Sequence, residues 1–367
     1  MKIPGLKILD RYIIRKFLGT YFFAIAIIIV ITVVFDAAEK MDDFIEMHAP
    51  VSKIVFQYYM NFIPFFINQF SGLLTFIAVI FFTSKLAYRT EIIAMLAGGV
   101  SFRRLMWPYF VSASAIAGMS LFLSLSVIPA ANVQRVDFEQ KYMKRFQTNA
   151  VDRHIYRQIR PGTYVYIRDY SQVDMKARYM VIEQYEGNAL TGSTEAADVA
   201  FDPATRRWSA PRHIVRTIDP ITRKETFDQN KGRLDTLLNL QAEELGRVEE
   251  LVKTMSITKL SRFIAQQRAK GSDMIEMFEV ERQSRFTFPV GTFILTLMGV
   301  ALSSRKVRGG TGLHIGIGIG LCASYLLIGR FAEEFAKGGV LPPLVSMWLP
   351  NLIFLGIALY LYRKAPK

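Results

Sequence analysis

Six long apolar runs constrain this chain more than any other feature of its sequence. Each is close to or above the ~20 residues that an α-helix needs to cross the hydrocarbon core of a bilayer. The runs are Phe17–Phe35, Ile54–Thr83, Trp107–Pro129, one that begins near Phe286 and ends before Ser303, Gly312–Phe331 and Val345–Tyr362. Membrane insertion also explains 51% hydrophobic residues, with 28 phenylalanines, better than a large soluble core does. The sequence predicts a polytopic α-helical membrane protein with six transmembrane helices in two groups of three.

A cleavable signal peptide is the alternative explanation of the first run. The apolar core of a signal peptide is normally about 7 to 15 residues long and ends at a small-residue cleavage site. Phe17–Phe35 is longer and ends at Asp36, so we expect a retained first span. The second span contains Asn68, Gln69 and Ser71, and polar groups at that depth normally face other helices or a cavity.

The charges of the short loops predict how the spans are oriented, because short loops rich in Lys and Arg stay in the cytoplasm. Segment 84–105, between the second and third spans, carries four bases and a single acid. Segment 1–16 is basic as well, and the chain ends with Arg363, Lys364 and Lys367. Loop 36–53 is mainly acidic. We expect both termini and segment 84–105 in the cytoplasm, and loop 36–53 outside.

Between the third and fourth spans the chain changes to short runs in which polar and apolar residues alternate. Turn sequences with Pro, Gly, Asn or Asp separate them, as is typical of antiparallel strands. The runs are Arg153–Ile159, Thr163–Tyr170, Arg178–Tyr185, Thr194–Phe201, Trp208–Thr217, Arg223–Asp228 and Gly232–Leu240. The pattern predicts an inserted all-β sandwich or jelly roll. The number of preceding spans places this domain outside.

We expect the chain to divide into four parts. They are a cytoplasmic amphipathic segment 1–16, spans one to three in 17–130, the β domain with flanking helices in 131–271, and spans four to six in 272–367. The flanking helices are a polar continuation of the third span, Asn132–Thr148, and an amphipathic helix, Met255–Gly271. A further helix from Asp273 leads into the fourth span.

Segment 84–105 has the features of a short helix that lies across the cytoplasmic ends of two spans. Tyr88–Ala97 contains good helix formers and no breaker, Gly98 and Gly99 end it, and Ser101 is an N-cap for the next helix. The only acid, Glu91, shares a helix face with Ala94, Met95 and Gly98. Such a helix is either a handle on which a cytoplasmic partner pushes or a linker that only anchors two spans.

Little in the sequence indicates catalysis or a cofactor. The four histidines are scattered, without an HExxH motif or carboxylate partners at metal-ligand spacing. Gly309–Gly312 lacks the ending of a phosphate-binding loop, so any nucleotide is expected on a partner. The single cysteine excludes a disulfide framework. The net charge of +14 is spread over loops beside apolar runs, which favours anionic lipid over nucleic acid.

Two further patterns are candidate contact sites. Gly312, Gly316 and Gly320 form a row of small residues in the fifth span, which either packs on a span of the same chain or forms a seam with a partner subunit. Cations follow the first and third spans at the outer face, and they include Lys40, Arg135 and Lys141. Such cations either bind lipid phosphates or merely snorkel to the interface.

Several stretches resemble the YjgP/YjgQ family, the LptF/LptG permeases of lipopolysaccharide export. Residues 8–13, ILDRYI, resemble the start of LptG more than that of LptF. Residues 89–99, RTEIIAMLAGG, resemble the coupling helix of the family. Residues 255–290 resemble the helix pair that returns to the membrane, and Leu341-Pro342-Pro343 followed by Leu349-Pro350-Asn351 resembles the last hairpin. The strand pattern with Trp208 resembles the periplasmic jelly roll of the family.

The resemblance implies a function in the bacterial inner membrane. The chain would be a subunit of an ABC transporter that extracts lipopolysaccharide from the outer leaflet of that membrane. Its partners would be a cytoplasmic LptB-like ATPase dimer, a paralogous LptF/LptG-type permease, an LptC-like protein and a periplasmic LptA-like bridge. By position, Glu91, within the Arg89–Gly98 part of the coupling helix, would contact the ATPase. Lys40 and Arg135 would lie near the lipid A phosphates.

Other functions remain open at this point. A permease of the MacB or FtsX kind, which transmits mechanical force, places its outer domain after the first of four spans, whereas here that domain follows the third of six. A structural envelope tether would not need polar residues inside the second span. An intramembrane hydrolase would need a nucleophile or a metal constellation, which we do not find.

Overall fold

The computed structural model describes residues 7–143, 151–171, 174–219, 222–238, 240, 248–269, 272, 274–304 and 310–365. It contains 6 helices that are long and apolar enough to cross a membrane. The chain divides into two compact units. The helical unit comprises Met1–Met41, Ser52–Gln134 and Glu279–Lys367, and the β unit comprises Asp42–Val51 and Arg135–Phe278. Residues 305–309 between the fourth and fifth spans, the predicted helix start at Asp273 and the basic residue Lys367 lie outside the described residues.

The first three spans begin with one long helix, α1 (Ile8–Glu46). The second span consists of α2 (Val51–Lys53), the π-helical turn η1 (Ile54–Tyr59) and α3 (Met60–Tyr88). A short helix, α4 (Glu91–Ala97), connects it to the third span. That span consists of α5 (Phe102–Phe122), a second π-helical turn η2 (Leu123–Val127) and α6 (Ile128–Tyr142). The predicted polar continuation of the third span is therefore helical as far as Tyr142.

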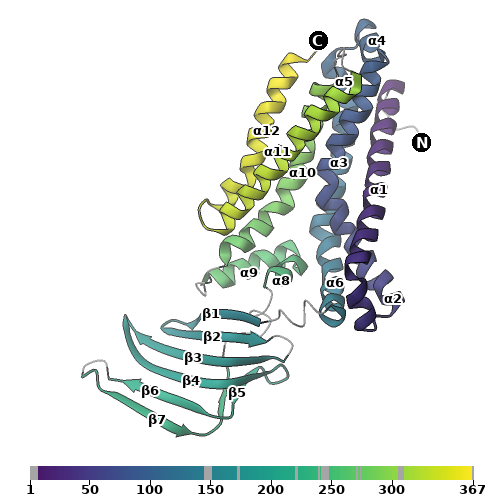
Figure 1. Ribbon diagram of the computed structural model, residues 1–367. Coiled ribbons are helices and arrows are strands. Elements are labelled where there is room, and N and C mark those ends of the chain that lie inside the picture. Colours follow the sequence, from purple (N-terminus) through teal and green to yellow (C-terminus); the bar gives the residue numbers. More distant parts are fainter. Residues whose placement is uncertain are drawn as a thin grey trace. The chain divides into compact units, whose positions relative to one another are not determined.

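The last three spans are α10 (Ile275–Ser303), α11 (Gly310–Lys337) and α12 (Pro343–Lys364). Figure 1 shows them side by side. The Asn351 side chain holds them together, because its Oδ1 accepts a hydrogen bond from the Tyr325 hydroxyl at 2.8 Å and its Nδ2 donates to the Thr287 carbonyl at 3.0 Å. Polar cross-links of this kind satisfy groups that lipid cannot.

α3 is the central span of the helical unit. One hydrophobic cluster packs it against α1 and α5, and a second packs it against α10, α11 and α12. Glycines allow the close approach on the second side. A Cβ at Gly299 would meet Val79 and Phe76, and a Cβ at Gly318 would collide with Ile80. A larger residue at either glycine would push α10 or α11 away from α3.

The described residues of the β unit form an antiparallel sheet of 8 strands (Figure 1). The strands are β1 (Val151–Arg160), β2 (Thr163–Ser171), β3 (Lys176–Glu186), β4 (Ala189–Asp202), β5 (Arg207–Ala210), β6 (His213–Ile218), β7 (Glu225–Lys231) and β8 (Leu234–Thr236). The first four pair in sequence order. The sheet then forks, since β4 pairs with β6 over Gly192–Ala196 and with β5 over Ala200–Asp202. The predicted antiparallel β domain between helices is confirmed.

One face of this sheet is buried. Val165 and Ile167 are buried on β2 two residues apart, as alternation along a strand requires, and Tyr170 near the end of the strand is buried as well. Trp208 is fully buried on the same core, and its indole N–H donates to the Leu240 carbonyl at 3.2 Å. Two helices follow the strands, α8 (Val248–Thr254) and α9 (Ile257–Ala269). With Phe278 they form a hydrophobic cluster of their own.

The structure corrects four boundaries. The predicted outer loop 36–53 is largely helical, because α1 continues to Glu46 through a stretch of good helix formers without Gly or Pro. The predicted helix Tyr88–Ala97 is broken, since α3 ends at Tyr88 and Thr90 adopts a left-handed φ of 62°. The predicted strand Trp208–Thr217 is two strands separated by Pro211, which has no N–H for the ladder. Helix α8 was not predicted.

Candidate functional site

The short helix α4 lies between two points at which the backbone turns sharply. Thr90 before it has a φ of 62°, and Gly99 after it has a φ of 84°. Glycine adopts the left-handed region at no steric cost, but a β-branched residue there is strained. Strain of this kind persists only where the surrounding structure fixes it, so packing around Thr90 maintains the break between α3 and α4. We call the region formed by this break, α4 and the first turn of α5 the α4 corner.

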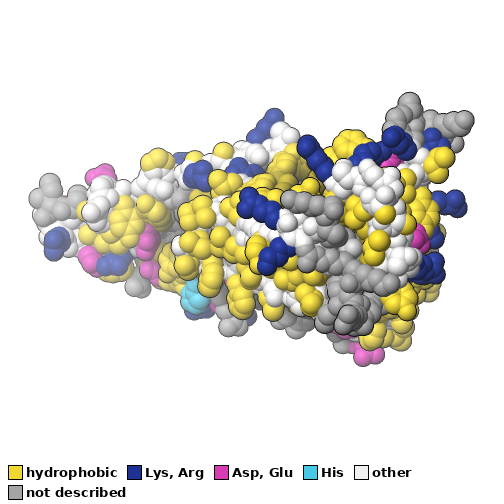
Figure 2. Space-filling model, turned by 90° about the horizontal axis from the view of Figure 1, so that it is seen from above, with side chains coloured by type: hydrophobic (Ala, Val, Ile, Leu, Met, Phe, Trp, Pro, Cys, Tyr) yellow, Lys and Arg dark blue, Asp and Glu magenta, His cyan; other side chains and the backbone are white. Residues whose placement is uncertain are grey.

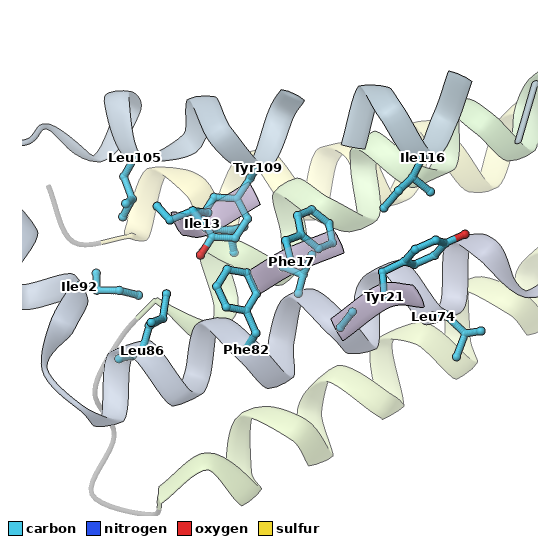
Figure 3. Close-up of a cluster of buried hydrophobic side chains, with 14 of the residues drawn as sticks. Ile13, Phe17, Tyr21, Leu74, Phe82, Leu86, Ile92, Leu105, Tyr109 and Ile116 are labelled. Carbon is cyan, nitrogen blue, oxygen red and sulfur yellow. The ribbon is translucent and has the colours of Figure 1, made fainter. Parts of the chain in front are cut away.

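One side of α4 is anchored in the core of the helical unit. Ile92 is 1% exposed, and Met95 and Leu96 pack against the same cluster. Figure 3 shows Ile92 close to Leu86 and directed into the space that the α1 and α5 side chains also fill. Residues at offsets of three and four share a helix face, so Ile92, Met95 and Leu96 are the buried face of α4.

The other side of α4 is a small apolar surface that we call the α4 patch. It consists of Ile93, Ala94, Ala97 and Gly98, all exposed. The structure exposes only part of the face that the sequence predicted as a contact surface. Ala94 and Gly98 are exposed, but Met95 is half-buried and its side of the helix belongs to the core. Ile93 and Ala97 were missed, although the apolar spacing of Ile92, Met95 and Leu96 indicates which side is buried.

Glu91 begins α4 and is held by the first helix. Its Oε2 accepts a hydrogen bond from the Tyr12 hydroxyl at 2.9 Å. A carboxylate offers about four acceptor positions on two oxygens, so one bond to Tyr12 leaves room for a guanidinium of a partner. Glu91 is half-buried beside the α4 patch, and Arg89 is exposed two residues before it.

A second contact ties the same corner to α1. Both carboxylate oxygens of Asp10 accept hydrogen bonds from the Arg104 guanidinium, at 2.7 and 2.6 Å. Asp10 is 1% exposed and also accepts the backbone N–H of Lys7 at 2.9 Å. Arg104 lies in the first turn of α5, which Ser101 caps as predicted, with its hydroxyl accepting the Arg104 N–H at 3.3 Å. The sequence did not signal the Asp10–Arg104 pair, because the two residues lie 94 positions apart.

The last span ends at this corner too. Phe102 and Tyr362 lie with ring centroids 5.8 Å apart, and both belong to the cluster that buries Ile92. Figure 2 looks along the helical unit from the end that carries α4, and Lys and Arg side chains dominate the charged groups in that view. The corner therefore offers an apolar patch with the Glu91 carboxylate beside it, among Lys and Arg side chains.

The cations predicted to lie at the outer face, Lys40 and Arg135, have partners within the chain. Lys40 Nζ lies 2.5 Å from Asp36 Oδ1 and also donates to the Tyr58 hydroxyl. Its ammonium is 4.8 Å from the centroid of the Tyr58 ring. Arg135, in the β unit, lies 3.5 Å from Glu139 and 3.9 Å from Glu250, and it is 9% exposed. Lys141 is exposed near the end of α6.

The glycine row of the fifth span faces open space. No described heavy atom lies within 4 Å of the position that a Cβ would take at Gly312, Gly316 or Gly320. Gly318, on the other side of α11, is the glycine that packs against α3. Packing on a span of the same chain therefore does not account for the row within the part of the chain described.

Polar groups inside the second span bond to its neighbours. Asn68 donates to Ser124 at 3.0 Å and accepts from Ser120 at 2.6 Å, and both serines lie on the third span. Ser71 shares a hydrogen bond of 2.9 Å with the Tyr21 hydroxyl of α1. The polar groups thus face other helices. In the described ranges, no three His, Cys, Asp or Glu side chains are grouped so that they could hold a metal ion.

Comparisons with known proteins give one family. The family described as "Lipopolysaccharide export system permease LptF/LptG" matches residues 11–364, which is nearly the whole chain. No curated protein matches the chain. The match includes α4, the β unit and all six candidate spans.

Proposed function

Because this chain belongs to the LptF/LptG family of lipopolysaccharide export permeases, we propose that it extracts lipopolysaccharide from the outer leaflet of the bacterial inner membrane, driven by a separate ATPase. Members of this family are permease subunits, and the six spans make this chain a multi-pass membrane protein. The observation that carries the proposal is the α4 corner, where an apolar patch and a carboxylate project from the end of a six-span unit.

The α4 corner is suited to a cytoplasmic LptB-like ATPase dimer. The α4 patch is small, so its apolar contact adds little unless a charged group is desolvated with it. Glu91 supplies that group, since a buried charge pair at an interface costs roughly 2 to 5 kcal/mol or more when one partner is removed. Arg89 and Met95 flank this contact, and Gly98 ends the helix on its exposed side. With α4 in the cytoplasm, the number of spans would put both termini in the cytoplasm as well and the β unit in the periplasm.

The seam with a paralogous LptF/LptG-type subunit is proposed along the glycine row of α11. Helices in lipid associate through close backbone approach, which small residues permit. The described part of the chain leaves Gly312, Gly316 and Gly320 uncovered, which is what such a seam requires. The family match covers both LptF and LptG and does not distinguish them for this chain.

The lipid A phosphates are proposed to meet Lys40, Arg135 and Lys141. Lys40 would give up its ion pair with Asp36 and form a comparable charge-assisted hydrogen bond with a lipid phosphate. The competing interpretation, snorkelling at the interface, requires no lipid contact. The lipid would leave through the β unit toward an LptC-like protein and a periplasmic LptA-like bridge.

Copurification tests the proposal. The chain is expressed with an affinity tag in its natural host and extracted from the membrane with detergent. The purified material is probed for an ATPase subunit, a second permease and lipopolysaccharide. We expect all three, with hydrolysis of ATP stimulated by added lipopolysaccharide. Isolation of the chain without any ATPase would favour a structural tether and contradict transport.

A further inference from the structure

We propose that the first turn of α1 is a relay, which carries movements of α4 to the first span through the Tyr12–Glu91 and Asp10–Arg104 contacts. This inference rests on the proposed function, because it assumes that an ATPase displaces α4. It assigns Asp10, Tyr12 and Arg104 as positioning residues, none of which the sequence singled out as a site.

The two contacts hold α1 from different directions. Successive residues of an α-helix are rotated by about 100°, so Asp10 and Tyr12 point to nearly opposite sides of α1. Asp10 bonds to α5 and Tyr12 bonds to α4. The corner formed by α4 and α5 therefore grips the first turn of α1 from both sides, and a displacement of the corner displaces that turn.

The Asp10–Arg104 pair is the stiffer of the two contacts. Asp10 is buried and accepts three hydrogen bonds, two of them from one guanidinium. A bidentate Arg–carboxylate pair fixes the mutual orientation of its partners, and a buried carboxylate that loses its cation is strongly destabilised. The first turns of α1 and α5 consequently move as one body.

α1 is suited to be moved, because the described part of the chain leaves the middle of this helix largely uncovered. Only 17% of its most apolar 18-residue window is buried, against 67% for α10. The buried stripe of α1 is Ile13, Phe17, Tyr21 and Ile25, and Figure 3 shows the first three of these directed toward α3 and α5. Farther along, from Val30 to Phe35, the large apolar side chains are mostly exposed. A force applied at the first turn therefore meets little packing between Val30 and Phe35, before the helix reaches the contact of Lys40 with Tyr58.

The experiment uses the full complex of this chain with its ATPase and second permease in nanodiscs. Cys322, the only cysteine, is replaced by Ala, and spin labels are placed at the exposed positions Val34 on α1 and Leu352 on α12. Pulsed EPR measures the distance between the labels without nucleotide and with ATP held by vanadate. ATP hydrolysis is measured with and without lipopolysaccharide.

Two single variants break the relay, a double variant restores the ion pair in reverse, and two further variants are matched controls. Tyr12→Phe removes one hydroxyl, Asp10→Asn removes the paired charge, and Asp10→Arg with Arg104→Asp restores the pair in reverse. Tyr88→Phe and Arg103→Gln change exposed side chains of the same kinds at the same corner. We expect the single relay variants to assemble and to hydrolyse ATP at the basal rate. Their stimulation by lipopolysaccharide should fall by about fivefold or more, and the nucleotide-dependent distance change should disappear.

The outcomes separate the relay from the proposed function. Both controls and the reversed pair should behave as the parent. If Tyr12→Phe and Asp10→Asn keep the parental distance change and stimulation, the relay is wrong. It is equally wrong if the parent is stimulated but its labels do not move, or if Asp10→Asn prevents assembly and the reversed pair does not restore it. If the parent itself binds no ATPase or ignores lipopolysaccharide, the proposed function fails instead.

Discussion

Single residues decide whether α4 is a handle or a linker, and Glu91 is the most informative. An exposed acid contributes only about 0 to 1 kcal/mol to an ion pair. An acid that is desolvated at an interface contributes more, so its removal measurably weakens binding of the partner. The Tyr12 bond orients the Glu91 carboxylate without using all of its acceptor positions, which favours the second case.

We predict that Glu91→Ala weakens ATPase binding about 30-fold or more, the equivalent of about 2 kcal/mol, while the chain still inserts. Glu91→Lys should be worse, because it adds a repulsive charge to a basic corner. Titration of the purified permease with the ATPase measures the effect. Glu39→Ala, an exposed acid on α1, is the control. Parental affinity in both Glu91 variants would leave α4 as a linker.

Lys40 is paired with Asp36, and this pair leads to a prediction about lipid binding. Lys40→Glu together with Arg135→Glu should reduce crosslinking to lipopolysaccharide, since two attractive charges become repulsive near phosphate. ATPase assembly should not change. Asp36→Asn should keep or raise crosslinking, because it releases Lys40 from its internal partner. Normal crosslinking in the double variant would leave only the snorkelling interpretation.

Among the elements, α11 carries the clearest structural asymmetry. Its glycine row is open, whereas Gly318 on the other side packs against α3. We predict that Gly316→Leu reduces association with the second permease, because a side chain holds two helix backbones apart. Gly118→Leu, the control, adds the same side chain at an open glycine of α5 and should leave this association unchanged. Co-immunoprecipitation from membranes measures both, and equal association would make the row a lipid-facing surface.

The elements also show what the sequence could and could not predict. Hydrophobic periodicity and turn chemistry located the six spans and most of the strands, but they merged β5 with β6 and began β4 at Thr194 instead of Ala189. The extension of α1 beyond Asp36 was missed because charge was used to mark loops, and charge reports on orientation rather than on helicity. The break at Thr90 carries no local signal, since no Gly or Pro marks it. Contacts such as Asp10–Arg104 depend on packing between distant segments.

The orientation of the whole molecule is the subject of the last prediction. In a variant without Cys322, single cysteines at Asp43 and Asp202 should react with an impermeant thiol reagent in intact spheroplasts. A cysteine at Arg103 should react only after permeabilisation. The charges of the short loops give this expectation. Labelling of the Arg103 position from outside would reverse the topology and remove α4 from the reach of any cytoplasmic ATPase.

The length of α1 has a mechanical consequence. At a rise of 1.5 Å per residue, its 39 residues extend for about 58 Å, nearly twice the ~30 Å of a hydrocarbon core. If this helix pivots as a rigid rod about its first turn, which α4 and α5 hold, a tilt of about 5° would swing the far tip by about 5 Å, close to the pitch of a helical turn. A small stroke at one bilayer surface would thus be amplified into the width of an acyl chain at the other.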